Sequence, residues 1–375
     1  MLNKMNSAYM RRAVFRQFKK NKWIFYWFEW FKWHKEIEYQ KHVNDSSLLK
    51  SLDKIKQEEK LVKDYWRLGT FHYYRYGLQY KHLTDEEILD YVPTYYFHKN
   101  IEKHHEGIDT IKFGDKWTQA ILFEERNIPT AKVVCVVKNN ICTNLMQDKV
   151  LDLKLVITEY LAKKGNKLFF KPTGNCGGAG ILVLKRNKEF YVLNGQPISS
   201  LDCLNSALLA NELYIVEENI IQSDQFMSIN SSSVNTIRTI VQQEGNKMVI
   251  KTCILRMGRN GKEVDNSAQG GISINIDVNT GAFAERATAE HGGENITLHP
   301  DSGFKFLGTK VDNWGTIKKQ IEEIANKLID FHDVALDIAL TPNGAILVEF
   351  NFRYGVEHQQ CVVGGVRRIF SINNH

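Results

Sequence analysis

The segment 335–351, ALDIALTPNGAILVEFN, combines acidic and amide side chains with two apolar stretches. Its Pro-Asn-Gly turn signal predicts a hairpin of two strands. Alternate residues of a strand share a face, so Glu349 and Asn351 point the same way. With a three-residue loop, Asp337 lies directly opposite Glu349. The sequence therefore predicts two carboxylates and an amide at one place.

Such a cluster has two explanations. Burying like charges side by side among apolar strands is costly unless another group compensates them. A hard divalent cation with oxygen ligands, such as Mg²⁺ carrying nucleotide phosphates, would compensate Asp337 and Glu349. The alternative is a solvated hairpin face on which the acids are incidental.

A glycine-rich loop follows Lys171, between apolar strands expected at 168–172 and 181–184. Glycines let a backbone approach a ligand and direct its N–H groups at phosphate oxygens, and Lys171 would add a positive charge. The loop lacks the Gly-Lys-Ser/Thr of a P-loop, and no helix is expected after it. A tight hairpin is the alternative explanation. The glycines that could contact phosphate are Gly174, Gly177, Gly178 and Gly180.

A third apolar strand, 213–218, ends in two acids about forty residues beyond the lysine. Glu217 or Glu218 could accept hydrogen bonds from a ribose or from an adenine amino group. A strand that simply ends at the surface would explain the same pattern.

In this order, the features resemble the ATP-grasp superfamily: a lysine strand with a glycine loop, an acid-ended strand, and then Asp…Glu-x-Asn. Lys116, just before a helix-like stretch, also fits that pattern. The chain is most similar to the sugar-transfer-associated ATP-grasp group over roughly residues 110–355. The segments that carry this resemblance are 233–238, 255–258, 264–266 with Gly270-Gly271, and 299–303.

The resemblance implies ATP and Mg²⁺ as cofactors and a role for each matching residue. Lys116, Lys171 and the four glycines would contact phosphates, and Glu217 with Glu218 would hold adenosine. Asp337, Glu349 and Asn351 would hold Mg²⁺. Arg256, Asn266 and Arg238 would face the reacting groups, with Arg256 stabilising charge as the intermediate forms.

The resemblance also implies a reaction. A carboxylate attacks the γ-phosphate of ATP, and an amine then displaces phosphate from the acyl phosphate. The group association suggests a uronic-acid carboxylate and an amino compound or amino acid, in bacterial capsule or O-antigen synthesis. The alternatives are a peptide-type ligase, a small-molecule kinase, or a non-catalytic nucleotide-binding scaffold of a glycan-assembly complex.

The implied fold is α+β: two α+β subdomains that clasp ATP, preceded by a mainly helical N-terminal region. Four parts are expected, at 1–108, 109–155, 156–220 and 221–375. The expected helices are 8–42, 46–66, 84–91, 115–126 and 314–331. In the part 109–155, one strand is expected at 131–137. In the part 221–375, strands are expected at 235–242, 247–256, 271–277, 334–340 and 345–351.

Composition fits a globular protein of two or three units, since the chain has 375 residues, 43% hydrophobic and 25% charged. Six scattered cysteines form no CxxC pair, which is typical of reduced thiols in a cytoplasmic protein. No nucleic-acid partner is expected, and the sequence leaves the oligomeric state open.

The first residues have a composition of their own. Residues 1–28 contain no Asp or Glu, seven Lys or Arg lie between Lys4 and Lys22, and eight aromatics fall within 23–33. This stretch is too short and too charged to span a bilayer. Basic residues beside aromatics predict a helix in residues 1–42 lying on the inner face of a membrane. The alternatives are a helix buried against the catalytic body, or stacking on nucleic acid.

Overall fold

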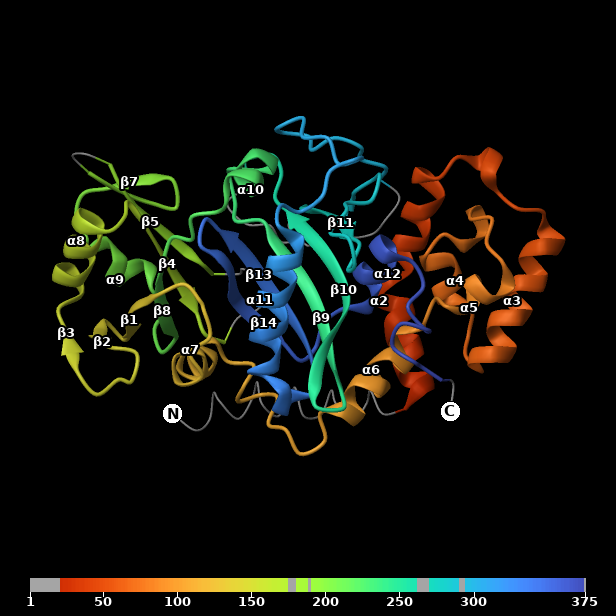
Figure 1. Ribbon diagram of the computed structural model, residues 1–375, viewed down its shortest axis with the longest axis horizontal. Helices are drawn as coiled ribbons and strands as arrows, with labels where there is room; N and C mark the ends of the chain where they lie inside the picture. The colour runs from red at the N-terminus through yellow and green to blue at the C-terminus, as the bar shows by residue number, and fades with distance from the viewer. Residues whose placement is uncertain (1–20, 175–179, 188–189, 262–269, 290–293, 374–375) are drawn as a thin grey trace. The chain divides into compact units, whose positions relative to one another are not determined.

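A computed structural model describes residues 21–174, 180–187, 190–261, 270–289 and 294–373 (Figure 1). The chain forms two compact units. The helical unit comprises residues 1–106, 286–296 and 355–375, and the sheet unit comprises residues 107–285 and 297–354.

The helical unit confirms the prediction of a mainly helical N-terminal region. Its helix α5 begins with a capping box, in which Thr84 and Glu87 each accept the other's backbone N–H. The helices are α2 (Lys22–Val43), α3 (Leu52–Trp66), α4 (Phe71–Arg75), α5 (Asp85–Leu89), α6 (Thr94–His104) and α12 (Val356–Val363). Two 3-10 turns, η1 (Ser46–Leu48) and η2 (Leu78–Tyr80), and the short strand β12 (Thr288–Ala289) complete it.

The core of the helical unit joins segments from both ends of the chain. Gln360 on α12 is fully buried. Its amide accepts a hydrogen bond from the Val92 N–H at 2.6 Å and donates to the Val92 carbonyl and the Tyr76 hydroxyl. Phe97 of α6 packs edge-on against Phe370. Residues 355–375 thus complete this core, whereas the sequence predicted a helical part only at residues 1–108.

The sheet unit contains two antiparallel sheets. In the first, the strand order is β3-β2-β1-β8-β4-β5-β6-β7. Its strands are β1 (Val133–Lys138), β2 (Ile141–Thr143), β3 (Val150–Leu151), β4 (Lys167–Pro172), β5 (Leu182–Arg186), β6 (Tyr191–Leu193), β7 (Gln196–Ile198) and β8 (Leu213–Glu218). The two strands predicted on either side of the glycine-rich loop are confirmed, and β4 pairs directly with β5. Residues 175–179 of the loop itself lie outside the described residues.

In the second sheet, β11, β10, β9, β13 and β14 are neighbours in that order. Their bounds are β9 (Thr236–Glu244), β10 (Lys247–Met257), β11 (Ile272–Ile276), β13 (Asp333–Thr341) and β14 (Gly344–Asn351). The helices of the unit are α7 (Lys116–Glu125), α8 (Leu153–Lys163), α9 (Cys203–Ala207), α10 (Asp224–Ile229) and α11 (Trp314–Asn326), with the turn η4 (Ile329–Phe331). Helix α11 packs on β10 and β14 (Figure 1).

Strand alternation gives each sheet a buried face and a face that carries polar groups. In β4, Leu168 and Phe170 are fully buried in a core that includes Ile157 of α8. Phe169 and Lys171 therefore point to the other side of the sheet. That side is where the candidate site lies.

The hairpin β13–β14 has a shorter turn than the sequence suggested. Thr341 pairs with Gly344, so the loop has two residues and not three. A bulge that contains Val348 then shifts the register, and Asp337 lies opposite Glu349. The predicted opposition of the two acids is confirmed, but the bulge produces it.

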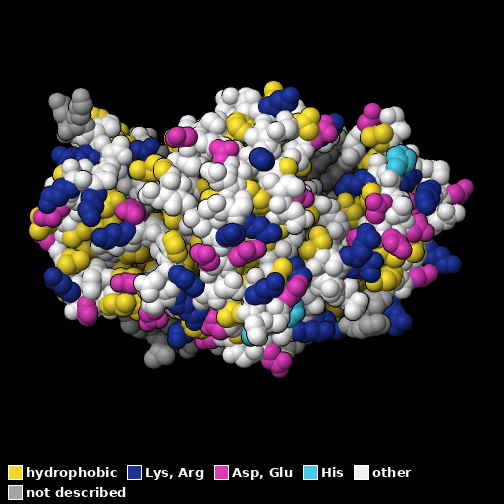
Figure 2. Space-filling view, viewed as in Figure 1, with side chains coloured by type: hydrophobic (Ala, Val, Ile, Leu, Met, Phe, Trp, Pro, Cys, Tyr) yellow, Lys and Arg dark blue, Asp and Glu magenta, His cyan; other side chains and the backbone are white. Residues whose placement is uncertain are grey.

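The surface is mixed in charge, and Lys, Arg, Asp and Glu side chains are interspersed over the face in Figure 2. Among the described helices, none has the length and apolar character needed to cross a bilayer.

Candidate functional site

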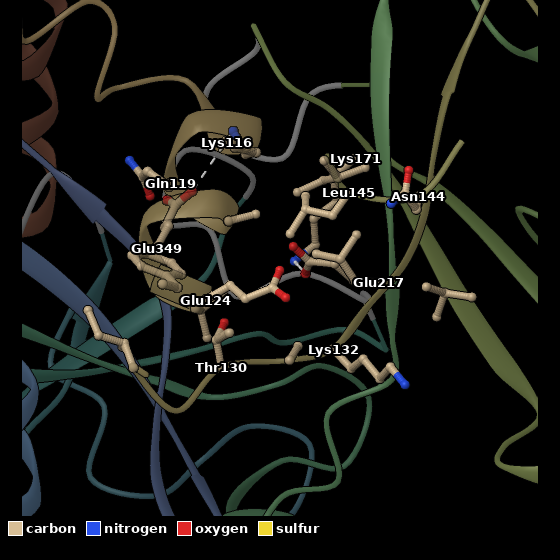
Figure 3. Close-up of a pocket in the computed structure, with 18 of the residues that line it drawn as sticks. Lys116, Gln119, Glu124, Thr130, Lys132, Asn144, Leu145, Lys171, Glu217 and Glu349 are labelled. Carbon is tan, nitrogen blue, oxygen red and sulfur yellow. Dashed lines mark hydrogen bonds and ion pairs between the residues drawn. The ribbon is translucent and has the colours of Figure 1, made fainter. Parts of the chain in front are cut away.

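A cavity of about 500 Å³ lies within the sheet unit (Figure 3). Its walls come from α7, from residues 127–134 and 144–146, and from strands β4, β8 and β14. The sequence-predicted residues in its lining are Lys116, Lys171, Glu217 and Glu349. Segments more than two hundred residues apart thus bring together the candidates for phosphate, adenosine and metal contact.

Lys171 and Glu217 form an ion pair on the cavity side of the first sheet. Strand β4 is the neighbour of β8, and Phe169 on β4 lies opposite Glu217 on β8. Lys171 is two residues after Phe169, so the Lys171 and Glu217 side chains lie on the same face of the sheet. The Lys171 Nζ lies 2.6 Å from the Glu217 Oε2. Each group holds the other at the cavity wall (Figure 3).

Glu218 lies on the opposite face of β8. Its carboxylate accepts the backbone N–H of Lys132 at 3.1 Å and the hydroxyl of Tyr160, on α8, at 3.1 Å. Burial and the adjacent Glu218 raise the pKa of Tyr160 to about 12. Of the two acids that end β8, Glu217 is the one that lines the cavity.

Lys116 is the first residue of α7, where the Asp115 side chain caps the helix by accepting the Thr118 N–H at 3.1 Å. The Lys116 Nζ lies 3.9 Å from the Glu349 Oε2, across the cavity (Figure 3). Both side chains are partly exposed, so an anion could take the place of Glu349 beside the lysine.

Three charged residues form a row across neighbouring strands of the second sheet. Arg238 on β9 pairs with Asp337 on β13, which pairs with Glu349 on β14. The Arg238 guanidinium binds both Asp337 oxygens, through Nε to Oδ1 and at 2.8 Å from Nη2 to Oδ2. Arg256 on β10 reaches the same Oδ2 at 3.3 Å. The row shares one face of the sheet, opposite the face of Cys253, which α11 covers.

The two arginines answer the charge problem posed by the sequence. Asp337 is buried, and burial alone would raise its pKa. The positive charges of Arg238 and Arg256 outweigh that effect and hold the pKa of Asp337 below its usual range. Asp337 thus has protein partners that compensate its charge before any cation binds.

The donor set still fits a hard cation. Asp337 accepts three hydrogen bonds from the arginines, whereas a carboxylate offers about four lone-pair sites. Glu349 is the cross-strand partner of Asp337, so two carboxyl groups share one face of the hairpin. The Asn351 amide nitrogen lies 3.3 Å from the Glu349 Oε1 and can turn its oxygen inward. Within the described residues, no group of three His, Cys, Asp or Glu could hold a metal ion, so the amide is the third ligand available.

Of the glycine-loop candidates, Gly174 and Gly180 are described. The Gly174 N–H donates to the Glu212 carboxylate at 3.3 Å, and Gly180 has a φ of +77°, which favours glycine. Gly177, Gly178 and Asn266 lie outside the described residues.

Sequence reasoning missed Gln119, which lines the cavity from α7. Its side chain accepts the Phe350 N–H at 3.2 Å and donates to the Phe350 carbonyl at 2.8 Å. Phe350 lies between Glu349 and Asn351, so Gln119 fixes the open edge of β14 between two predicted metal ligands. The one signal in the sequence was its spacing: Gln119 is three residues after Lys116, so both side chains lie on the same side of the predicted helix.

Several solved structures are similar to this chain at low identity. A biotin carboxylase–β,γ-ATP complex from Campylobacter jejuni is 12% identical, with a TM-score of 0.39, 70% of this chain covered and 46% of that one. Phosphoribosylamine–glycine ligase from Thermotoga maritima is 12% identical, with a TM-score of 0.39 and coverages of 66% and 49%. The biotin carboxylase domain of Hydrogenobacter thermophilus 2-oxoglutarate carboxylase, with MgADP and bicarbonate, is 14% identical, with a TM-score of 0.37 and coverages of 69% and 46%.

The chain spans about half the length of these solved structures. No curated protein sequence matches it.

Residues 98–369 match the family described as sugar-transfer-associated ATP-grasp. The match extends over well more than half of the chain and includes every described residue of the candidate site. It confirms the fold expected from the sequence, an α+β ATP-grasp fold preceded by a helical region. The chain therefore belongs to the sugar-transfer-associated ATP-grasp family.

Proposed function

We propose that this protein is an ATP- and Mg²⁺-dependent carboxylate–amine ligase that works through an acyl phosphate. The observation that carries the proposal is the cavity itself, where Lys116, Lys171, Glu217 and Glu349 meet beside the Arg238–Asp337 pair. Family membership supports the use of ATP, and the charges support the transfer of a phosphoryl group to an anionic acceptor.

The cavity has charges for both ends of a nucleotide. Lys116 and Lys171 approach it from α7 and β4 and would bind phosphate oxygens as point charges. Glu217 would accept hydrogen bonds from the adenosine, and its contact with Lys171 would loosen as phosphates arrive.

Asp337, Glu349 and Asn351 would hold Mg²⁺, which supplies charge neutralisation for the phosphoryl oxygens when bound. Arg256 and Arg238 keep Asp337 ionised. Arg256 would also stabilise negative charge on an acyl phosphate or on the intermediate formed from it. The described site has no need of a protein nucleophile, because positioning and charge stabilisation suffice for this chemistry.

We further propose that the carboxylate belongs to a uronic acid of a bacterial surface polysaccharide and that the co-substrate is an amino compound. The sugar-transfer association of the family supports the glycan. Peptide-type ligation and kinase-type phosphorylation share the nucleotide site and differ in product, so product analysis separates them: a ligase gives a new amide and a kinase a stable phosphoester.

The first experiment is isothermal titration of ATP, with and without Mg²⁺, into the wild type and Glu349→Ala. We expect Mg²⁺-dependent binding that weakens about tenfold or more in the variant, since one carboxylate ligand is lost. Glu159→Ala, on the exposed side of α8, is the matched control and should bind like the wild type. Equal binding by Glu349→Ala and Glu159→Ala would contradict the assignment of the site.

The second experiment measures phosphate release with mixed uronates and amines. Phosphate formed only when both are present, with an amide in the products, supports the ligase. ATP binding without turnover for any uronate would refute the proposed substrate class and leave the nucleotide site standing.

A further inference from the structure

Helix α2 presents a row of aromatic side chains to solvent. Trp23, Trp27, Trp30 and Phe31 recur at helical spacing, so they share one side of the helix. We call these four residues the aromatic face. Trp27 and Phe31 are 56% and 64% exposed, and the Trp30 and Phe31 rings contact each other at 5.1 Å between centroids. Soluble proteins rarely expose contiguous apolar surface of this kind without a binding role.

The other side of α2 is buried in the helical unit. Phe25 is 2% exposed and packs on Tyr95 and His98 of α6, with centroids 5.9 and 6.1 Å away. Glu29 is buried beside it, 3.6 Å from the guanidinium of Arg75 on α4. The helix is therefore anchored by one side, and its aromatic face is not the side that the fold uses.

The sequence up to and just beyond the aromatic face is strongly basic. Glu29 is the only acid among residues 1–31, and it points into the helical unit toward Arg75. Residues 1–20 of the sequence contain six Lys or Arg and no Asp or Glu. Lys22 begins the helix, and Lys35 is exposed one turn beyond Phe31. The next acid described on this side of α2 is Glu38, two turns beyond Phe31, and Lys41 pairs with it at 2.8 Å. Positive charge therefore prevails in the sequence up to and including the aromatic face.

We propose that the aromatic face docks on the surface of an anionic phospholipid membrane, with α2 parallel to the bilayer plane. Tryptophan suits the headgroup region because its ring is apolar and its N–H can reach a polar partner. Lysine and arginine near an anionic surface each add about 1 kcal/mol of attraction. Burial of Phe25 and Glu29 fixes the rotation of the helix, so the rings enter the interface without unfolding of the helical unit.

A protein partner fits these observations less well. Tryptophan is common both in protein interfaces and in the headgroup region of membranes, so the charge has to decide between them. The excess of Lys and Arg over Asp and Glu in residues 1–35 matches the negative charge of an anionic leaflet.

The test is flotation of the full-length protein with two kinds of vesicle: phosphatidylcholine alone, and equimolar phosphatidylcholine and phosphatidylglycerol. We expect the wild type to float with the anionic vesicles and to bind neutral ones more weakly. Trp27→Ser/Phe31→Ser should lose about tenfold or more of its partitioning. Leu155→Ser/Leu209→Ser, at sites 57% and 59% exposed in the sheet unit, is the matched control and should partition like the wild type.

Two further readouts make the outcome decisive. Brominated acyl chains should quench tryptophan fluorescence in the wild type, which separates insertion of the rings from adsorption by charge alone. Light scattering without vesicles reports whether the aromatic face pairs two copies of the chain. The proposal is overturned if the wild type stays in the bottom fraction with anionic vesicles, if Trp27→Ser/Phe31→Ser floats unchanged, or if those substitutions abolish a dimer and not vesicle binding.

Discussion

At the scale of single residues, the site depends on how Asp337 is kept ionised in a buried position. The guanidinium groups of Arg238 and Arg256 both bind its carboxylate, and the contact with Arg238 is bidentate. Such a contact fixes the orientation of the carboxylate as well as its charge. Removal of one partner of a buried pair is strongly destabilising, because the other charge stays behind.

Arg238→Gln should therefore lower the free energy of unfolding by about 3 kcal/mol, with Arg256 limiting the loss. Lys154→Gln, whose partner Asp202 is exposed, is the control and should cost less than about 1 kcal/mol. Urea denaturation at neutral pH measures both changes. A cost for Arg238→Gln no larger than that of the control would show that the Asp337 pair contributes little.

The same pair predicts a pH dependence. A carboxyl whose pKa is lowered by folding stabilises the native state above its unfolded pKa, near 3.8, and that stability is lost as pH falls through the native value. In Arg238→Gln the pKa of Asp337 rises, so the loss should begin at a higher pH than in the wild type. Urea titrations repeated below about pH 5 would reveal the shift.

At the scale of elements, β14 is an edge strand that the rest of the sheet unit covers. Gln119 bonds the backbone of Phe350, and the Leu347 N–H donates to the Pro129 carbonyl at 2.8 Å. These contacts occupy backbone groups that an open edge would leave for another strand. They also fix the part of the strand that carries Glu349 and Asn351.

Gln119→Leu should destabilise the protein by about 2 to 4 kcal/mol, because the buried N–H and the buried carbonyl of Phe350 would lose their hydrogen bonds to Gln119. ATP binding in Mg²⁺ should weaken as well, since Glu349 is next in the chain. Gln196→Leu, at an exposed position on β7, should change stability by no more than about 0.5 kcal/mol. Hydrogen exchange at the Phe350 amide is the local readout, and unchanged protection there would contradict the role given to Gln119.

Sequence patterns predict these elements better than they predict the contacts between them. The Asp337–Glu349 opposition follows from strand alternation and a turn signal, yet the actual loop is shorter and the bulge at Val348 corrects the register. Alternation alone also cannot say which of Glu217 and Glu218 faces the cavity, because that depends on which side of β8 the helix α8 covers. Gln119 and Phe350 are 231 residues apart, and no local pattern encodes such a contact.

At the scale of the whole molecule, the helical unit contains a buried histidine whose charge depends on folding. His72 lies buried in the helical unit, and burial lowers its pKa to about 3, against a smaller opposing effect of a hydrogen bond with the Gly69 backbone. A neutral imidazole in the native state must be charged when the chain unfolds below its ordinary pKa of 6.5. The stability of the helical unit is therefore tied to pH.

Below pH 6.5 the helical unit should lose stability as pH falls toward 3, by about 1.4 kcal/mol per pH unit from His72 alone. Hydrogen exchange at Val62, in the core of α3, measures this directly. His72→Gln should flatten the dependence, and His42→Gln, at an exposed site on α2, should leave it unchanged. Equal slopes in wild type and His72→Gln would contradict the prediction.

The contact between Gln360 and Val92 joins residues 268 positions apart. A ribosome releases the chain from its N-terminus, so α3 to α6 emerge long before the helix that completes their core. Until residues 355–375 leave the exit tunnel, Tyr76 lacks its native contact with Gln360 and Phe97 lacks its native contact with Phe370. The helical unit therefore closes only after the whole sheet unit has been made, and a chain that stops short of Gln360 presents that incomplete core to chaperones and proteases.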